Sequence, residues 1–71
     1  MEDNINKRFG KRLRELREKH GWTQEELAQN SGVDYKYIQR LEGKTPSSPT
    51  LNTVEKLAKA FQIKLSKLTD A

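Results

Sequence analysis

The most constraining feature of the sequence is a pair of helix start signals, at Thr23 and Asp34, with a glycine between them. Thr23 and Glu26 form a capping box, in which each side chain accepts a hydrogen bond from the backbone N–H of the other residue. Gly32 can adopt the left-handed conformation that ends a helix. Because little chain separates the two start signals, residues 23–44 are predicted to form two short helices joined by a tight turn.

A first helix is predicted before this pair, between an N-cap at Asn4 and a stop at Gly21. Its apolar residues follow one another at spacings of four, four and three, which is typical of one helix face. These residues are Ile5, Phe9, Leu13 and Leu16. Gly10 lies inside the pattern at a cost of about 1 kcal/mol relative to alanine. The prediction therefore depends on the apolar face and on the strong helix formers around Gly10.

Each of the two central helices has a hydrophobic staple, in which the residue before the cap packs against the fourth helical residue. The staples pair Trp22 with Leu27 and Val33 with Ile38. Trp22 is therefore interpreted as a structural residue. The first of these helices is expected to end near Asn30. The second, with Ile38 and Leu41 facing inward, is expected to end at Gly43.

Two further helices complete the predicted fold. Ser48 and Pro49 are expected to be the N-cap and first residue of a fourth helix, because proline suits the first helical position. Its apolar face consists of Leu51, Val54, Leu57, Ala58 and Phe61. A short fifth helix is expected from about Leu65 to Asp70. No alternating run of β-branched residues indicates a strand, so the fold class is all-α.

Composition excludes several classes of function. The 71 residues contain no cysteine, and the one histidine, His20, cannot by itself build a zinc site or a Ser-His-Asp triad. No apolar run approaches the roughly 20 residues that span a bilayer, and the N-terminus lacks the apolar segment of a signal peptide. We expect one cytoplasmic domain over residues 1–71, ordered over about 5–69, with no cofactor, metal, membrane or small-molecule partner. The net charge of +4 and the pI near 9.6 favour an anionic partner.

The segment 23–44, TQEELAQNSGVDYKYIQRLEGK, resembles the helix-turn-helix of phage repressors, the XRE/Cro family. The matching residues are Arg17, Thr23, Gln24, Glu26, Leu27, Ala28, Gly32, Tyr37, Ile38, Arg40, Leu41 and Glu42. The later run LNTVEKLAKAF resembles the family's fourth helix, so the resemblance covers roughly residues 5–68. It implies a compact bundle of five helices that binds operator DNA as a dimer and regulates transcription. Gly43 follows Glu42 directly, whereas the family usually has its glycine two residues after that glutamate.

The resemblance assigns roles to individual residues. The third helix is expected to read bases in the major groove through its outer face, which carries Tyr35, Lys36, Gln39 and Arg40. The residues expected to contact DNA phosphates are Gln24, Tyr37, Lys44 and Thr45. The position of Gln24 agrees with the anion affinity of helix N-termini. Arg17 and Glu42 match a charged pair that connects the family's first helix to the end of its third.

A homodimer is predicted through the C-terminal region, where four large apolar residues lie close together in the sequence. These are Phe61, Ile63, Leu65 and Leu68. One short helix offers too little length to fold all four onto the core, and Leu65 with part of Phe61 is the expected surplus. A two-fold axis there would make the interface self-complementary.

The charged residues of the first helix have two interpretations. They include Lys7, Arg8, Lys11, Arg12, Arg14, Glu15, Arg17, Glu18 and Lys19. They can form a DNA-facing arm, or an ordinary solvated face with ion pairs between residues four apart, and the second interpretation is favoured.

The leading hypothesis is a nucleoid-associated regulator of transcription that reads a palindromic operator as a homodimer. The alternative is an antitoxin-like or adaptor domain whose main partner is a protein. The basic and partly aromatic outer face of the third helix favours DNA over that alternative. A third hypothesis is an enzyme. The sequence shows no nucleophile–base pair, metal cluster or phosphate-binding loop that would support it.

Overall fold

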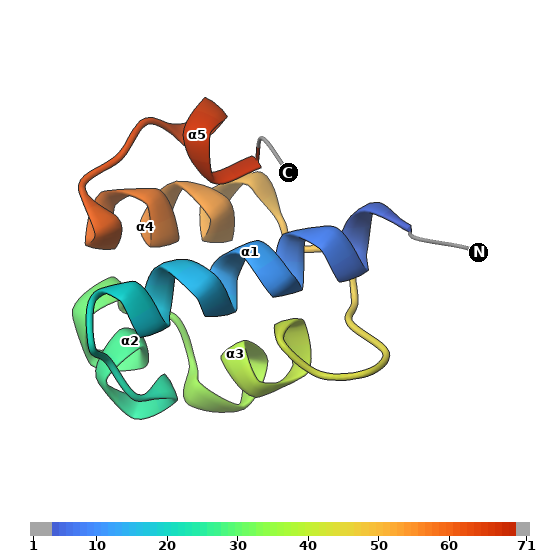
Figure 1. The fold of residues 1–71 in the computed structure, drawn as a ribbon, viewed down its shortest axis with the longest axis horizontal. Coiled ribbons are helices and arrows are strands. Elements are labelled where there is room, and N and C mark those ends of the chain that lie inside the picture. Colours follow the sequence, from blue (N-terminus) through green and yellow to red (C-terminus); the bar gives the residue numbers. More distant parts are fainter. Residues whose placement is uncertain (1–3, 70–71) are drawn as a thin grey trace.

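Five helices make up the computed structural model, which describes residues 4–69. They are α1 (Ile5–Lys19), α2 (Gln24–Ser31), α3 (Tyr35–Leu41), α4 (Leu51–Phe61) and α5 (Leu65–Thr69). In Figure 1, α1 crosses the middle of the molecule, with α4 and α5 on one side and α2 and α3 on the other. No strand occurs within residues 4–69, and the all-α prediction is confirmed. Asp70, the expected end of the fifth helix, lies outside the described residues.

The first helix begins where its cap predicts. The side chain of Asn4 accepts a hydrogen bond from the backbone N–H of Lys7 at 2.9 Å. Phe9, Leu13 and Leu16 are buried, as expected. Ile5 is not, because it is the first residue of α1, and the buried face of the helix begins one turn later.

Gly10 is the point at which α1 and α3 meet most closely. A Cβ atom built on Gly10 would lie closer than 3.0 Å to the carbonyl oxygen of Leu41, the last residue of α3. Only a residue without a side chain allows the two backbones this approach. The glycine that weakens the helix pattern in the sequence is therefore required by the packing.

The two central helices form as predicted. Thr23 and Glu26 make both hydrogen bonds of the capping box, at 2.9 and 3.1 Å. Gly32 ends α2 in the left-handed conformation, with φ of 76°. The carboxylate of Asp34 accepts hydrogen bonds from the first turn of α3. The inward residues Leu27, Ile38 and Leu41 are completely buried, so α2 and α3 are fixed relative to each other by both turn geometry and packing.

The start of α4 differs from the prediction. Its N-cap is Thr50, whose hydroxyl accepts a hydrogen bond from the backbone N–H of Thr53 at 3.1 Å. Ser48 instead donates to the side chain of Asn6 at 3.1 Å. Because the helix begins two residues later than expected, Leu51 falls in its first turn and is 81% exposed. The assignment of Leu51 to the core was wrong.

The core continues through α4 into α5. Val54, Leu57, Phe61 and Leu68 are buried, and the rings of Trp22 and Phe61 stack with centroids 5.7 Å apart. The packing of Trp22 confirms its structural interpretation. Within residues 4–69, no helix combines the length and the apolar character needed to traverse a bilayer.

Candidate nucleic-acid interface

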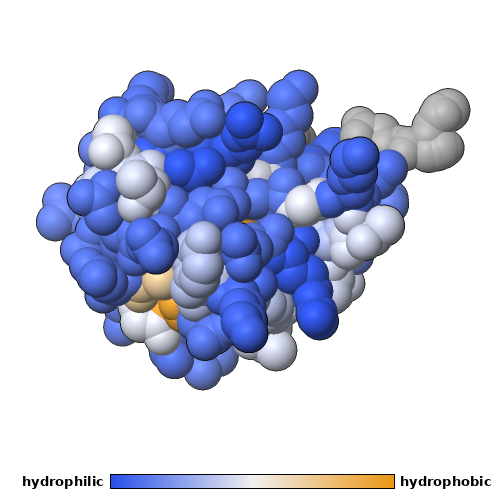
Figure 2. Space-filling model, turned by 90° about the horizontal axis from the view of Figure 1, so that it is seen from below, coloured by the Kyte–Doolittle hydropathy of each residue, from blue (hydrophilic) through white to orange (hydrophobic). Residues whose placement is uncertain are grey.

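The outer face of α3 is a row of exposed polar side chains. It carries Tyr35, Lys36, Gln39 and Arg40, all of them exposed. The opposite face of this short helix is anchored by Ile38 and Leu41, which are 0% exposed. The side of the molecule formed by α2 and α3 is mostly hydrophilic, with one small apolar patch (Figure 2). The helix is thus held firmly by one face while the other remains free for a polar partner.

Two residues of this row are hydrogen-bonded to each other. The side-chain amide of Gln39 donates to the hydroxyl of Tyr35 at 3.1 Å. An amide NH2 group has two N–H donors, so Gln39 keeps one donor and its carbonyl oxygen for another partner. Our sequence reasoning missed this pair, although the spacing of four residues on one helix is a signal for it.

Arg17 and Glu42 connect the end of α1 to the end of α3. The guanidinium donates to both carboxylate oxygens of Glu42, at 2.9 and 3.0 Å. It also donates to the carbonyl oxygen of Trp22 at 2.8 Å. The side chains of the pair are only 12% and 3% exposed, respectively. The hydrogen bond to Glu42 raises the pKa of Arg17 above its ordinary value, so the guanidinium remains charged at neutral pH.

Gln24 joins this network from the start of α2. Its side-chain amide donates to Glu42 at 3.1 Å and is half-buried. One N–H donor of the amide is used by this contact, and the other remains. The carboxylate of Glu42 therefore fixes the orientation of the residue expected to contact a phosphate. Nothing in the sequence spacing pointed to this contact, because residues 24 and 42 come together only through packing.

The remaining expected phosphate ligands lie in α3 and in the loop that follows it. Tyr37 is half-buried and packs against the core, whereas Lys44 and Thr45 are exposed in the loop after the helix. No group of three or more side chains in residues 4–69 is arranged to hold a metal ion.

The expected dimer surface needs a correction. Phe61 and Leu68 are 2% and 0% exposed, because α5 folds back against both α1 and α4 and places them in the core. Leu65 is 43% exposed and Ile63 is half-buried. These two residues line a shallow surface groove together with the exposed Leu51. The apolar surface at this end of the molecule is therefore formed by Leu51, Ile63 and Leu65.

Comparisons with known proteins identify the same helix-turn-helix fold. A model described as helix-turn-helix matches residues 13–68. A Pyrococcus abyssi protein whose name describes it as an HTH-type transcriptional regulatory protein is 47% identical over 58 residues, which are 82% of this chain and 18% of that protein. An Archaeoglobus fulgidus protein named as an uncharacterized HTH-type transcriptional regulator is 42% identical over 57 residues, or 80% of each chain. This chain thus spans less than a fifth of the first relative and most of the second.

A solved structure has a similar fold. The crystal structure of the restriction-modification controller protein C.AhdI from Aeromonas hydrophila matches with a TM-score of 0.82 and 40% sequence identity. The match covers 89% of this chain and 94% of that one.

Proposed function

The chain belongs to the helix-turn-helix family of XRE type, whose members are DNA-binding regulators rather than enzymes, and we propose that it reads a palindromic operator as a homodimer. In this proposal α3 enters the major groove of B-DNA, which is about 12 Å wide and admits one helix. A protein of this kind acts on the chromosome in the cytoplasm.

The observation that carries the proposal is the division of α3 into a fully buried face and an exposed polar face. Lys36 and Arg40 supply donors that suit the O6 and N7 acceptors of guanine. Gln39, with one donor and one acceptor still free, suits adenine. Tyr35 holds that amide in place and packs beside the same bases. These four residues are the proposed source of sequence preference.

The phosphate contacts have a different role, which is to set the position of α3 on the duplex. Gln24 lies at the N-terminus of α2, where the partial positive charge of the helix favours an anion. Its amide is oriented by Glu42. In the proposal, Tyr37 in α3 and Lys44 and Thr45 in the following loop make the other phosphate contacts. Their removal weakens binding to every sequence alike.

The proposed dimer uses the apolar surface of Leu51, Ile63 and Leu65. A self-complementary patch around a two-fold axis buries these side chains against a second copy. The two copies of α3 then enter successive major grooves, about 34 Å apart, on a palindromic site.

Selection of bound duplexes from a random DNA pool tests the proposal. We expect an enriched motif with two inverted half-sites separated by about one helical turn. Enrichment of a single unrepeated half-site would contradict the dimer. The absence of any enriched motif would contradict sequence-specific binding.

A further inference from the structure

We propose that a groove between α1 and the loop after α3 seats a phosphate of the DNA backbone, outside the stretch contacted by α3 itself. The inference rests on the proposed function, because it concerns the same DNA. It assigns a binding role to one side of α1, whose charged residues have two interpretations in the sequence.

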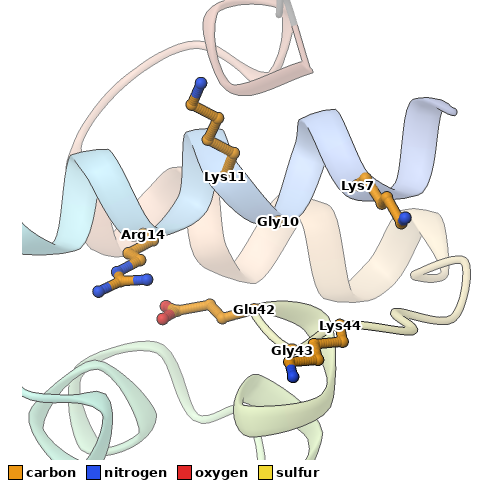
Figure 3. Close-up of a pocket in the computed structure, with 7 residues that line it drawn as sticks. All are labelled: Lys7, Gly10, Lys11, Arg14, Glu42, Gly43 and Lys44. Atoms are coloured by element: carbon orange, nitrogen blue, oxygen red, sulfur yellow. The ribbon is translucent and has the colours of Figure 1, made fainter. Parts of the chain in front are cut away.

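The groove has a volume of about 460 Å³ and is bounded by two separate segments of the chain. Lys7, Gly10, Lys11 and Arg14 line it from α1, and Glu42, Gly43 and Lys44 line it from the end of α3 and the following loop. Figure 3 shows the side chains of Lys7 and Arg14 on the side of α1 that faces this loop, whereas the amine of Lys11 points away from Glu42. The cations that serve the groove are therefore Lys7, Arg14 and Lys44.

Acidic side chains within residues 4–69 neutralise these cations only weakly. The ion pairs within residues 4–69 are Arg14–Glu18 and Arg17–Glu42. The first is exposed, with side chains 62% and 56% accessible, so the pairing of Arg14 is weak. Because Arg14 is only weakly paired and Lys7 and Lys44 form neither of these pairs, the three cations repel one another and attract an external anion.

The one acid in the groove does not cancel this charge. Glu42 already accepts hydrogen bonds from Arg17 and from Gln24, and its side chain is 3% exposed. Its negative charge is balanced from behind by the guanidinium of Arg17, which does not line the groove. The groove thus presents the positive charges of its rim to solvent.

The position of the groove identifies the anion as a backbone phosphate. Lys44 is both a wall of the groove and a proposed phosphate ligand at the end of α3. In this proposal the DNA strand that passes Lys44 also passes Lys7 and Arg14, because all three residues line the same groove. Sugar–phosphate contacts carry no base preference. The groove therefore increases the affinity for DNA and helps to fix the position of the protein on the duplex, without changing which bases are read.

The test compares two double variants with the same change in charge. Lys7→Gln with Arg14→Gln removes two groove cations. Arg8→Gln with Lys56→Gln removes two exposed cations that do not line the groove. For each variant and for the unaltered chain, the affinity for the selected duplex and for a scrambled duplex is measured by fluorescence anisotropy between 50 and 200 mM salt. Thermal unfolding followed by circular dichroism checks that both variants are folded.

Each lost phosphate contact lowers the slope of log affinity against log salt by about 0.9. We therefore expect the groove variant to reduce the slope by about 0.9 for each bound chain, equally on both duplexes. The control variant should retain a slope close to that of the unaltered chain. Equal slopes for both variants would overturn the groove assignment and leave the proposed function intact. A failure of the unaltered chain to bind either duplex would overturn both.

Discussion

The close approach at Gly10 leads to a quantitative prediction for Gly10→Ala. In an exposed helix interior this change stabilises a protein by about 1 kcal/mol. Here the added Cβ would lie closer than 3.0 Å to the carbonyl oxygen of Leu41, which is a backbone atom and cannot rotate aside. Overpacking of this kind typically costs 1–3 kcal/mol of stability. Because the main chain cannot move aside as a side chain can, we assign this clash a cost of about 3 kcal/mol, at the upper end of that range. The expected net loss of stability is therefore about 2 kcal/mol.

Thermal unfolding followed by circular dichroism measures this loss. In a domain of this size, 1 kcal/mol corresponds to about 4–8 °C in Tm, so we expect Gly10→Ala to lower Tm by about 8–16 °C. Lys11→Ala, at the next and exposed position, is the matched control and should change stability by less than about 0.5 kcal/mol. An unchanged or higher Tm for Gly10→Ala would refute the backbone contact between α1 and α3.

Three further changes test other parts of the structure. Glu42→Gln leaves the Arg17 guanidinium largely buried without a carboxylate, and urea unfolding should show a loss of about 3 kcal/mol. Tyr35→Phe removes the acceptor for Gln39, so binding assays should show a loss of preference of about 1 kcal/mol at a single base pair; a uniform loss across sequences would contradict the pairing. Leu65→Lys should shift sedimentation equilibrium toward the monomer, and an unchanged dimer would exclude this apolar surface as the interface.

Local sequence signals predicted most of the fold because each helix start depends on residues close in the chain. Asn4, the capping box of Thr23 and Glu26, and Asp34 all cap the helices they were expected to cap. The start of α4 was missed because Ser48 and Thr50 are both good caps, and only the packed structure shows which side chain meets the first turn.

Features set by contacts between distant segments could not be predicted in this way. The role of Gly10 depends on Leu41, and the orientation of Gln24 depends on Glu42. The burial of Leu68 likewise follows from the return of α5 onto α1 and α4, which no local pattern encodes. The outer face of α3, by contrast, follows from helical spacing alone once its inward residues are known.

The most direct test of the proposed reading of DNA compares Arg40→Ala with Gln24→Ala in the same selection from a random DNA pool. Arg40→Ala should lose its preference at one symmetric pair of positions, by about 1–3 kcal/mol, and retain the rest of the motif. Gln24→Ala should enrich the original motif with lower affinity for all sequences, because a phosphate contact carries no base preference. A Gln24→Ala chain with an altered motif, or an Arg40→Ala chain with an unaltered one, would contradict the assignment of base reading to the outer face of α3.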